Sequence, residues 1–499
     1  MAQSTRELTS GTIWKQVVSF ALPLLAASLV QLLYNFVNQV FAGQFIGTNA
    51  SAAIAASALL LACLVNFFNG LGVGASVIVS RHFVQDNHDD YSKALHTAAA
   101  IAVFGGTALM VAGIVLAPVF LMWLQTPAEI FDDAVLYLRI FFVSGLPMVA
   151  YNLLAGVIRA LGNSKSPMMY QIIGGFVNVA INILLVAVLQ IGVAGPAIAT
   201  VFAQGMCAVL AFRYLLKLDG HHRLHPRLIR FDVPMLKTIL RIGVPAGVQM
   251  MSITLSNLVI QSQINLLGVT DIAAFAYYFQ LENFIYNPIV AVGQTVMVFV
   301  SHNLAADQVD RARRGIRVSI GIGVFAAVFV GAVMWMFAPQ FFALFTVDAA
   351  VIDVGVSILR FTFPFYSAYV FIEVFSNAAR GSGRSWQPMA IILSVMCGLR
   401  LVVLFAFVNL IGGVIAIAAV YPVTWIAAGT LLVIYYFASR CIENADFGEE
   451  EREHQAEELA EMKLDSLSVP PEEEWAEVHE ESLDEPLSQT ERICAHARK

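Results

Sequence analysis

Three charged side chains interrupt long apolar runs in the second half of the chain: Glu282, Glu373 and Arg400. A charge at the centre of a membrane helix costs about 2.5–3.5 kcal/mol on an insertion scale, so each needs a role or a partner there. A carboxyl group in a low-dielectric cavity favours its protonated form, and it can take a proton from one side of a membrane and release it to the other. Glu282 and Glu373 therefore predict a site that couples to a cation. The alternative is a buried ion pair or triad that only fixes helix packing.

The depth of these groups indicates how they can be arranged. Glu282 and Arg400 lie 11 and 12 residues inside their apolar runs, about 16–18 Å along a helix. This comparable depth allows the two to pair, which leaves Glu373 as the group that titrates. For Arg400 we favour a structural or charge-balancing role within the ion-coupling site.

The first half has no acid at this depth and carries amides instead. Side-chain hydrogen bonds between membrane helices are worth about 0.6–2 kcal/mol each, which is the packing explanation for such residues. As a group facing a cavity, the same amides would line a wet path for a substrate. We therefore predict substrate-binding roles for Asn35, Asn38, Asn66, Asn152, Asn178 and Asn182.

Twelve apolar segments must position these residues. Hydrophobic residues make up 59% of the chain and charged residues 13%, and each segment can cross a hydrocarbon layer of about 30 Å. The chain is therefore predicted to be an all-α integral membrane protein with helices at 14–42, 50–80, 94–118, 133–158, 168–189, 193–216, 236–265, 271–302, 316–338, 353–378, 388–410 and 413–438.

The two halves of the chain repeat one another at a spacing of about 221 residues. Identical residues hold this register along both halves, among them the pairs Gly47/Gly268, Gly72/Gly293, Ser80/Ser301 and Pro167/Pro388. Six spans in each half make the repeat parallel, with two lobes related by an axis along the membrane normal. Such an arrangement suits a transporter that opens to each side in turn around a site between its halves.

The distribution of charged residues indicates the orientation of the chain in the membrane and the boundaries of its domains. Lys and Arg occur in every second loop and are absent from loops 43–49, 119–132, 190–192, 266–270, 339–352 and 411–412, so both termini are predicted to be cytoplasmic. Residues 1–440 carry a net charge of +7 and residues 441–499 one of −14. We expect a first lobe at 1–216, a linker at 217–235, a second lobe at 236–440 and an acidic, mostly disordered tail at 441–499.

The sequence lacks the signature motifs of several functional classes. The chain has no P-loop and no His-Glu-x-x-His motif, so we expect neither ATP-driven transport nor enzyme activity. The linker histidines His221, His222 and His225 allow a metal site, but a solvated linker near anionic lipid is the favoured interpretation. The five cysteines give no disulfide pattern. We expect no cofactor, no metal and no nucleic-acid partner, and a monomer in contact with membrane lipid.

Four short segments, Leu22–Gly43, Arg159–Pro167, Phe299–Asn303 and Arg380–Gly383, resemble the multidrug and toxic compound extrusion (MATE) family. Leu22–Gly43, which contains Tyr-Asn-Phe-Val-Asn-Gln-Val-Phe-Ala-Gly, resembles the first helix of that family. Arg159–Pro167 and Arg380–Gly383 resemble its paired cytoplasmic turns, and Phe299–Asn303 resembles the end of its eighth helix. The resemblance covers about residues 10–440.

Membership would imply two six-helix lobes forming a V around a central cavity in a cell (inner) membrane. It would also imply antiport, in which organic and often cationic compounds leave in exchange for H⁺ or Na⁺. Some relatives have an acid at the position of Asn38, and another branch has one in the seventh helix, where this chain has Gln249, Ser252, Asn257 and Gln261. Glu282 and Glu373 match acids that some relatives have in helices eight and ten, which places the expected coupling in the second lobe.

Two alternatives to a drug antiporter stay open. Related two-lobed folds flip lipid-linked saccharides, but a pyrophosphate would need several cations, and only Arg400 lies at mid-depth. A receptor or scaffold that recruits partners through its acidic tail is the third interpretation, and it would fail if 441–499 were deleted.

Overall fold

The computed structural model describes residues 8–41, 48–123, 126–443 and 445, and the regular structure of this part is helical. Eleven helices are long and apolar enough to cross a membrane. A twelfth span is formed by α5 (Ala128–Val143) and α6 (Gly145–Ala160), which meet at a bend of 43°. The predicted all-α membrane fold with twelve spans is therefore confirmed. The acidic segment 446–499, predicted to be disordered, lies outside the described residues.

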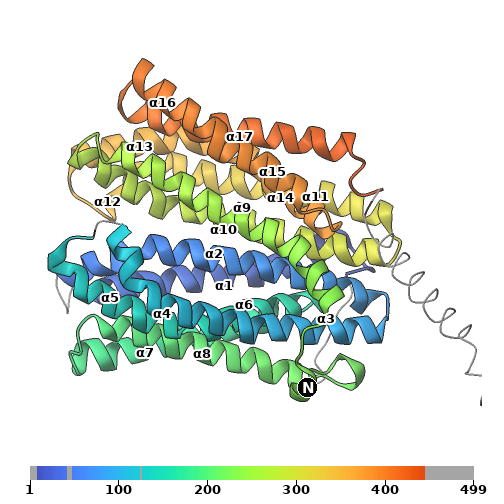
Figure 1. Cartoon of the computed structure of the whole chain (residues 1–499). Helices are drawn as coiled ribbons and strands as arrows, with labels where there is room; N and C mark the ends of the chain where they lie inside the picture. The colour runs from blue at the N-terminus through green and yellow to red at the C-terminus, as the bar shows by residue number, and fades with distance from the viewer. Residues whose placement is uncertain (1–7, 42–47, 124–125, 444, 446–499) are drawn as a thin grey trace, which may run out of the picture. The chain divides into compact units, whose positions relative to one another are not determined.

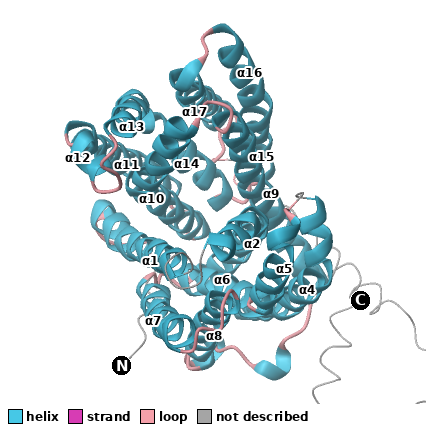
Figure 2. Ribbon diagram, turned by 90° about the vertical axis from the view of Figure 1, so that its left-hand side faces the viewer, coloured by secondary structure: helices cyan, strands magenta, loops and turns pink. Residues whose placement is uncertain are grey.

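The spans form two lobes (Figures 1 and 2). The first lobe contains α1 (Ile13–Phe41), α2 (Thr48–Val84), α3 (His88–Ala100), the π-helical η2 (Ile101–Gly105), α4 (Gly106–Trp123), α5, α6, α7 (Lys165–Asn182), the π-helical η3 (Ile183–Val188) and α8 (Ala194–Leu216). The second lobe contains α9 (Val233–Ile264), α10 (Val269–Ala305), α11 (Val309–Met336), α12 (Ala338–Ala343), α13 (Ala349–Thr362), the 3₁₀-helical η6 (Phe363–Phe365), α14 (Tyr366–Gly381), α15 (Trp386–Leu393), the π-helical η7 (Ser394–Leu399), α16 (Arg400–Leu410) and α17 (Gly413–Ala438).

Some helices extend beyond their apolar runs, so the predicted starts at 94 and 316 were too late. The first turn of α3 is acidic and is capped by Asn87, whose side chain accepts a hydrogen bond from the Asp90 backbone N–H. Such a cap stabilises a helix end outside the hydrocarbon, where an apolar pattern gives no signal. Helix α11 likewise begins with a polar turn that contains Asp310.

The two lobes meet most closely where α2 crosses α9. Gly70 and Gly74 on α2 face Gly243 and Gly247 on α9, and a Cβ atom on Gly70 would lie 2.1 Å from the backbone nitrogen of Gly247. Glycines four residues apart let two membrane helices pack backbone to backbone. The α2–α9 crossing is therefore a tight contact between the lobes.

A second contact between the lobes lies at one end of the bundle, where α2 and α10 end and the linker joins α8 to α9. We call this end of the bundle the linker end. The hydroxyl groups of Ser80 and Ser301, which are equivalent in the repeat, lie 2.5 Å apart there, and both are buried. The His302 imidazole binds the carbonyl oxygen of Ala160, at the end of α6, at 2.7 Å. The lobes are thus closed against each other at the linker end.

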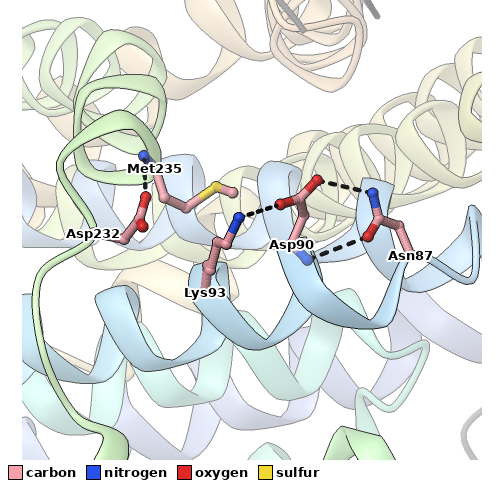
Figure 3. Close-up of polar contacts among 5 residues, drawn as sticks. All are labelled: Asn87, Asp90, Lys93, Asp232 and Met235. Atoms are coloured by element: carbon pink, nitrogen blue, oxygen red, sulfur yellow. Dashed lines mark hydrogen bonds and ion pairs between the residues drawn. The ribbon is translucent and has the colours of Figure 1, made fainter. Parts of the chain in front are cut away.

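The linker is attached to the first lobe along α3. The His225 N–H donates to His96 Nε2 at 3.0 Å, and the Asp232 N–H donates to Thr97 Oγ1 at 3.2 Å. The Asp232 side chain in turn caps α9 by accepting the Met235 N–H at 3.0 Å, beside the Asn87–Asp90–Lys93 contacts that begin α3 (Figure 3). The start of the second lobe is therefore held in place by the first.

Candidate ion-coupling site

Glu282 lies on α10 and faces α14. Its carboxylate accepts a hydrogen bond from the hydroxyl group of Tyr366, which is fully buried. Tyr278 and Tyr286 stand one turn to either side on the same face of α10, and the three positions share this face because they are four residues apart. A carboxylate in this position accepts one hydroxyl donor and lies among tyrosine side chains, an environment that can hold either a proton or a desolvated cation.

Glu373 lies on α14 in a second polar group. It accepts hydrogen bonds from the Tyr369 hydroxyl at 3.2 Å and from the Asn377 amide at 2.9 Å. Asn377 also accepts a hydrogen bond at 3.1 Å from Arg380, which is buried. Gly293 of α10 makes room for this group, because a Cβ atom there would lie 2.9 Å from Glu373 Oε2. The polar face of α14 therefore runs from Glu373 to Arg380, about two turns further along.

Arg400 is buried at the start of α16 and does not form the ion pair with Glu282 that their comparable depth allowed. Its guanidinium group donates to Asn257 Oδ1 at 3.0 Å and to Thr424 Oγ1 at 3.3 Å, and it lies 5.3 Å from the centre of the Tyr421 ring. Glu282 is close enough for the two charges to interact without direct contact. This arrangement fits a charge-balancing role.

Aromatic side chains that were not predicted to belong to the site connect the three charged groups. The Trp425 ring of α17 lies 4.6 Å from the ring of Tyr366, 5.7 Å from that of Tyr369 and 5.8 Å from that of Tyr421. Tyr366 and Tyr369 each bond one of the acids, and Tyr421 stacks on the arginine. The recurrence of Tyr and Glu at three- and four-residue intervals in α10 and α14 was the signal that could have indicated this cluster.

The predicted amides of the first lobe separate into different surroundings. Asn182 Nδ2 donates to Asn38 Oδ1 at 2.7 Å and to Asn178 Oδ1 at 3.1 Å, so these three form one cluster between α1 and α7. Asn66 instead donates to Thr254 Oγ1 of α9 at 2.9 Å, across the lobe boundary. Asn35 is exposed and Asn152 is partly buried. Substrate binding by these residues stays a prediction.

The linker histidines stack on neighbouring imidazoles. The ring centres of His221 and His88 lie 4.5 Å apart, and those of His225 and His96 lie 6.4 Å apart. Burial lowers the pKa of His222, and the nearby His88 lowers it further. Within the part of the chain that the structure describes, no three His, Cys, Asp or Glu side chains are grouped so that they could hold a metal ion.

The sequence matches a known family and known relatives. The family model described as MatE matches residues 23–184 and again residues 245–406, once in each lobe. The "Probable multidrug resistance protein YoeA" of Bacillus subtilis is 24% identical over 444 residues, which cover 86% of this chain and 94% of that protein. The "Multidrug export protein MepA" of Staphylococcus aureus is 26% identical over 442 residues, which cover 86% and 95%.

Solved structures share the fold. A transporter of the MOP superfamily from Pyrococcus furiosus superposes with a TM-score of 0.82 at 18% identity, covering 89% of this chain and all of that one. A structure described as the outward-facing conformation of a multidrug resistance MATE family transporter gives the same TM-score at 19% identity, covering 89% and 99%. With the family model matched in both halves, the chain belongs to the MATE family of multidrug efflux transporters.

Proposed function

We propose that this protein is a secondary active antiporter that exports organic, often cationic, compounds in exchange for H⁺ or Na⁺. The observation that carries the proposal is the pair of acids on facing helices of the second lobe, Glu282 and Glu373, each bonded to a tyrosine hydroxyl. Buried acids in membrane spans are typical of proton and cation relays. The names of the relatives YoeA and MepA, which describe drug resistance and export, support the choice of cargo.

Coupling follows from the two states of each acid. A charged carboxylate without a bound cation is unfavourable in free energy at this depth of the membrane. Each acid therefore binds a coupling ion or pairs with a cationic substrate. If both cannot bind at once, uptake of the ion displaces the substrate. One charge that moves through 100 mV yields about 2.3 kcal/mol, which sustains a concentration ratio of roughly 40-fold. Arg400 balances the remaining charge without contacting Glu282 directly.

Alternating access requires that the two lobes part at each end in turn. We propose that residues 1–216 and 236–440 move as the two lobes, joined by the linker 217–235. Following the distribution of Lys and Arg, we place the linker end and both termini in the cytoplasm. The contacts between Ser80 and Ser301 and between His302 and Ala160 then close the cytoplasmic side. The amide cluster of Asn38, Asn178 and Asn182 offers donors and acceptors to the substrate in the first lobe, and the protein works as a monomer.

The flippase alternative is not favoured. A lipid-linked pyrophosphate would require several cationic side chains around the site, whereas Arg400 already has three hydrogen-bond partners and a ring beneath it. The carboxylates of Glu282 and Glu373 in the same lobe would repel the anionic headgroup.

The experiment that tests this function measures efflux with a single imposed ion gradient. Inverted membrane vesicles that contain the protein are incubated with a fluorescent organic cation in the outer solution, and a pH gradient or a Na⁺ gradient is applied alone. We expect that one of the two gradients drives accumulation of the dye and that its collapse by an ionophore stops it. Accumulation that needs ATP, or that neither gradient drives, would refute the antiporter.

A further inference from the structure

The segment Leu8–Gly11 precedes α1 and crosses to the second lobe. We call it the N-terminal strap. The Leu8 N–H donates to His302 Nδ1 at 3.3 Å, and the Leu8 carbonyl oxygen accepts from Asn303 Nδ2 at 3.2 Å. Both partners are fully buried in the last turns of α10, and the Leu8 residue itself is only 3% exposed. The strap is thus held by both of its backbone groups and by an inserted apolar side chain.

His302 makes this contact part of the contact between the lobes. Because its Nδ1 accepts from Leu8, its Nε2 is free to donate to the Ala160 carbonyl oxygen at the end of α6, 2.7 Å away. One neutral imidazole from the second lobe therefore binds the strap on one side and the first lobe on the other. The adjacent residue, Ser301, binds Ser80 of α2.

A second side chain ties the strap to α11. The Gln16 amide nitrogen donates to the Ser10 carbonyl oxygen, and its Oε1 accepts from Arg311 at 2.8 Å. The Gln16 side chain is buried, and its contact with Arg311 is partly buried. The start of α1 is therefore attached to two helices of the opposite lobe.

The strap and the inter-lobe linker lie at equivalent positions in the internal repeat. In the second half the equivalent position, before α9, is occupied by the linker, which joins the lobes covalently and docks on α3 through Asp232 and Thr97. The strap lies at the corresponding position before α1 and reaches the opposite lobe through the non-covalent contacts of Leu8 with His302 and Asn303. A covalent link persists in every state, whereas the strap can dissociate.

We propose that the N-terminal strap is a releasable latch that holds the linker end closed and must leave α10 before the lobes part there. The inference rests on the proposed function, because it assumes that the linker end opens during transport. Leu8 is the residue that keeps the latch docked, and His302 is the group through which docking reinforces the contact between the lobes.

The test uses Ser80→Cys as a reporter in a protein whose five native cysteines are replaced, because the buried Ser80 becomes accessible only when the linker end opens. Leu8→Asp forces a charge into the docking site, while Ser10→Asp adds the same charge to an exposed side chain of the same strap. We expect Leu8→Asp to speed maleimide labelling of the reporter at least about tenfold, equivalent to ~1.4 kcal/mol, and Ser10→Asp to leave the rate unchanged. If Leu8→Asp does not fold, Leu8→Ala should give a smaller increase in the same direction.

The outcomes separate the latch from the function on which it rests. Equal labelling rates in the Leu8 and Ser10 variants, with faster labelling of the reporter during active transport, would overturn the latch and leave alternating access intact. A reporter that stays unlabelled in every variant and throughout transport would show that the linker end never opens. That result would refute the proposed function together with the latch.

Discussion

A disulfide between residues 80 and 301 is expected to stop transport completely and reversibly. The Ser80 and Ser301 oxygens already lie 2.5 Å apart, so the double variant Ser80→Cys, Ser301→Cys brings two sulfurs near the S–S bond length of about 2.05 Å. The covalent bond between the lobes prevents their separation at the linker end. Dye efflux should cease on oxidation and return with a reductant.

The matched controls are the two single cysteine variants in the same cysteine-replaced background. Each can be oxidised under the same conditions but cannot form the bridge between lobes, so each should retain its efflux. Efflux that continues in protein shown by electrophoresis to be fully cross-linked would mean that transport does not require the lobes to part at the linker end.

Replacement of either acid by its amide is expected to abolish coupled efflux while leaving the protein in the membrane. Glu282→Gln and Glu373→Gln preserve side-chain size and can still accept the tyrosine hydrogen bonds, but an amide does not exchange a proton and does not carry the charge that holds Na⁺. We expect the rate of dye efflux to fall at least tenfold in each variant, which corresponds to a rise of ~1.4 kcal/mol or more in the activation free energy of transport.

Glu129→Gln provides the control for that loss, because it makes the same chemical change at an exposed position in the first turn of α5. Its efflux should equal that of the unchanged protein. Normal efflux in both Glu282→Gln and Glu373→Gln, at equal amounts of protein in the membrane, would remove these acids from the coupling mechanism.

The arrangement of spans was predictable because it depends on local pattern. Apolar length sets the number of helices, and residue identities 221 positions apart indicate two equivalent lobes. The polar first turns of α3 and α11 were not predictable from apolar length, because a capped turn in water carries no hydrophobic signal. Their starts were therefore placed too late.

The candidate site was predictable in its acids and not in their partners. A charge within an apolar run is visible in one segment, so Glu282, Glu373 and Arg400 could be named. Which residue faces each charge depends on how helices far apart in the sequence pack. Tyr366, Asn257 and Trp425 became partners only through the positions of α14, α9 and α17. For the same reason depth alone allowed an ion pair between Glu282 and Arg400, and packing gave each of them other partners.

The most direct test of ion-coupled exchange measures whether the substrate displaces a bound coupling ion from the purified protein. In weakly buffered solution, addition of an organic cation should release protons, or release Na⁺ from sodium-loaded protein, and Glu282→Gln, Glu373→Gln protein should release neither. Substrate binding that displaces no ion from the unchanged protein, or equal release from the double variant, would contradict the account.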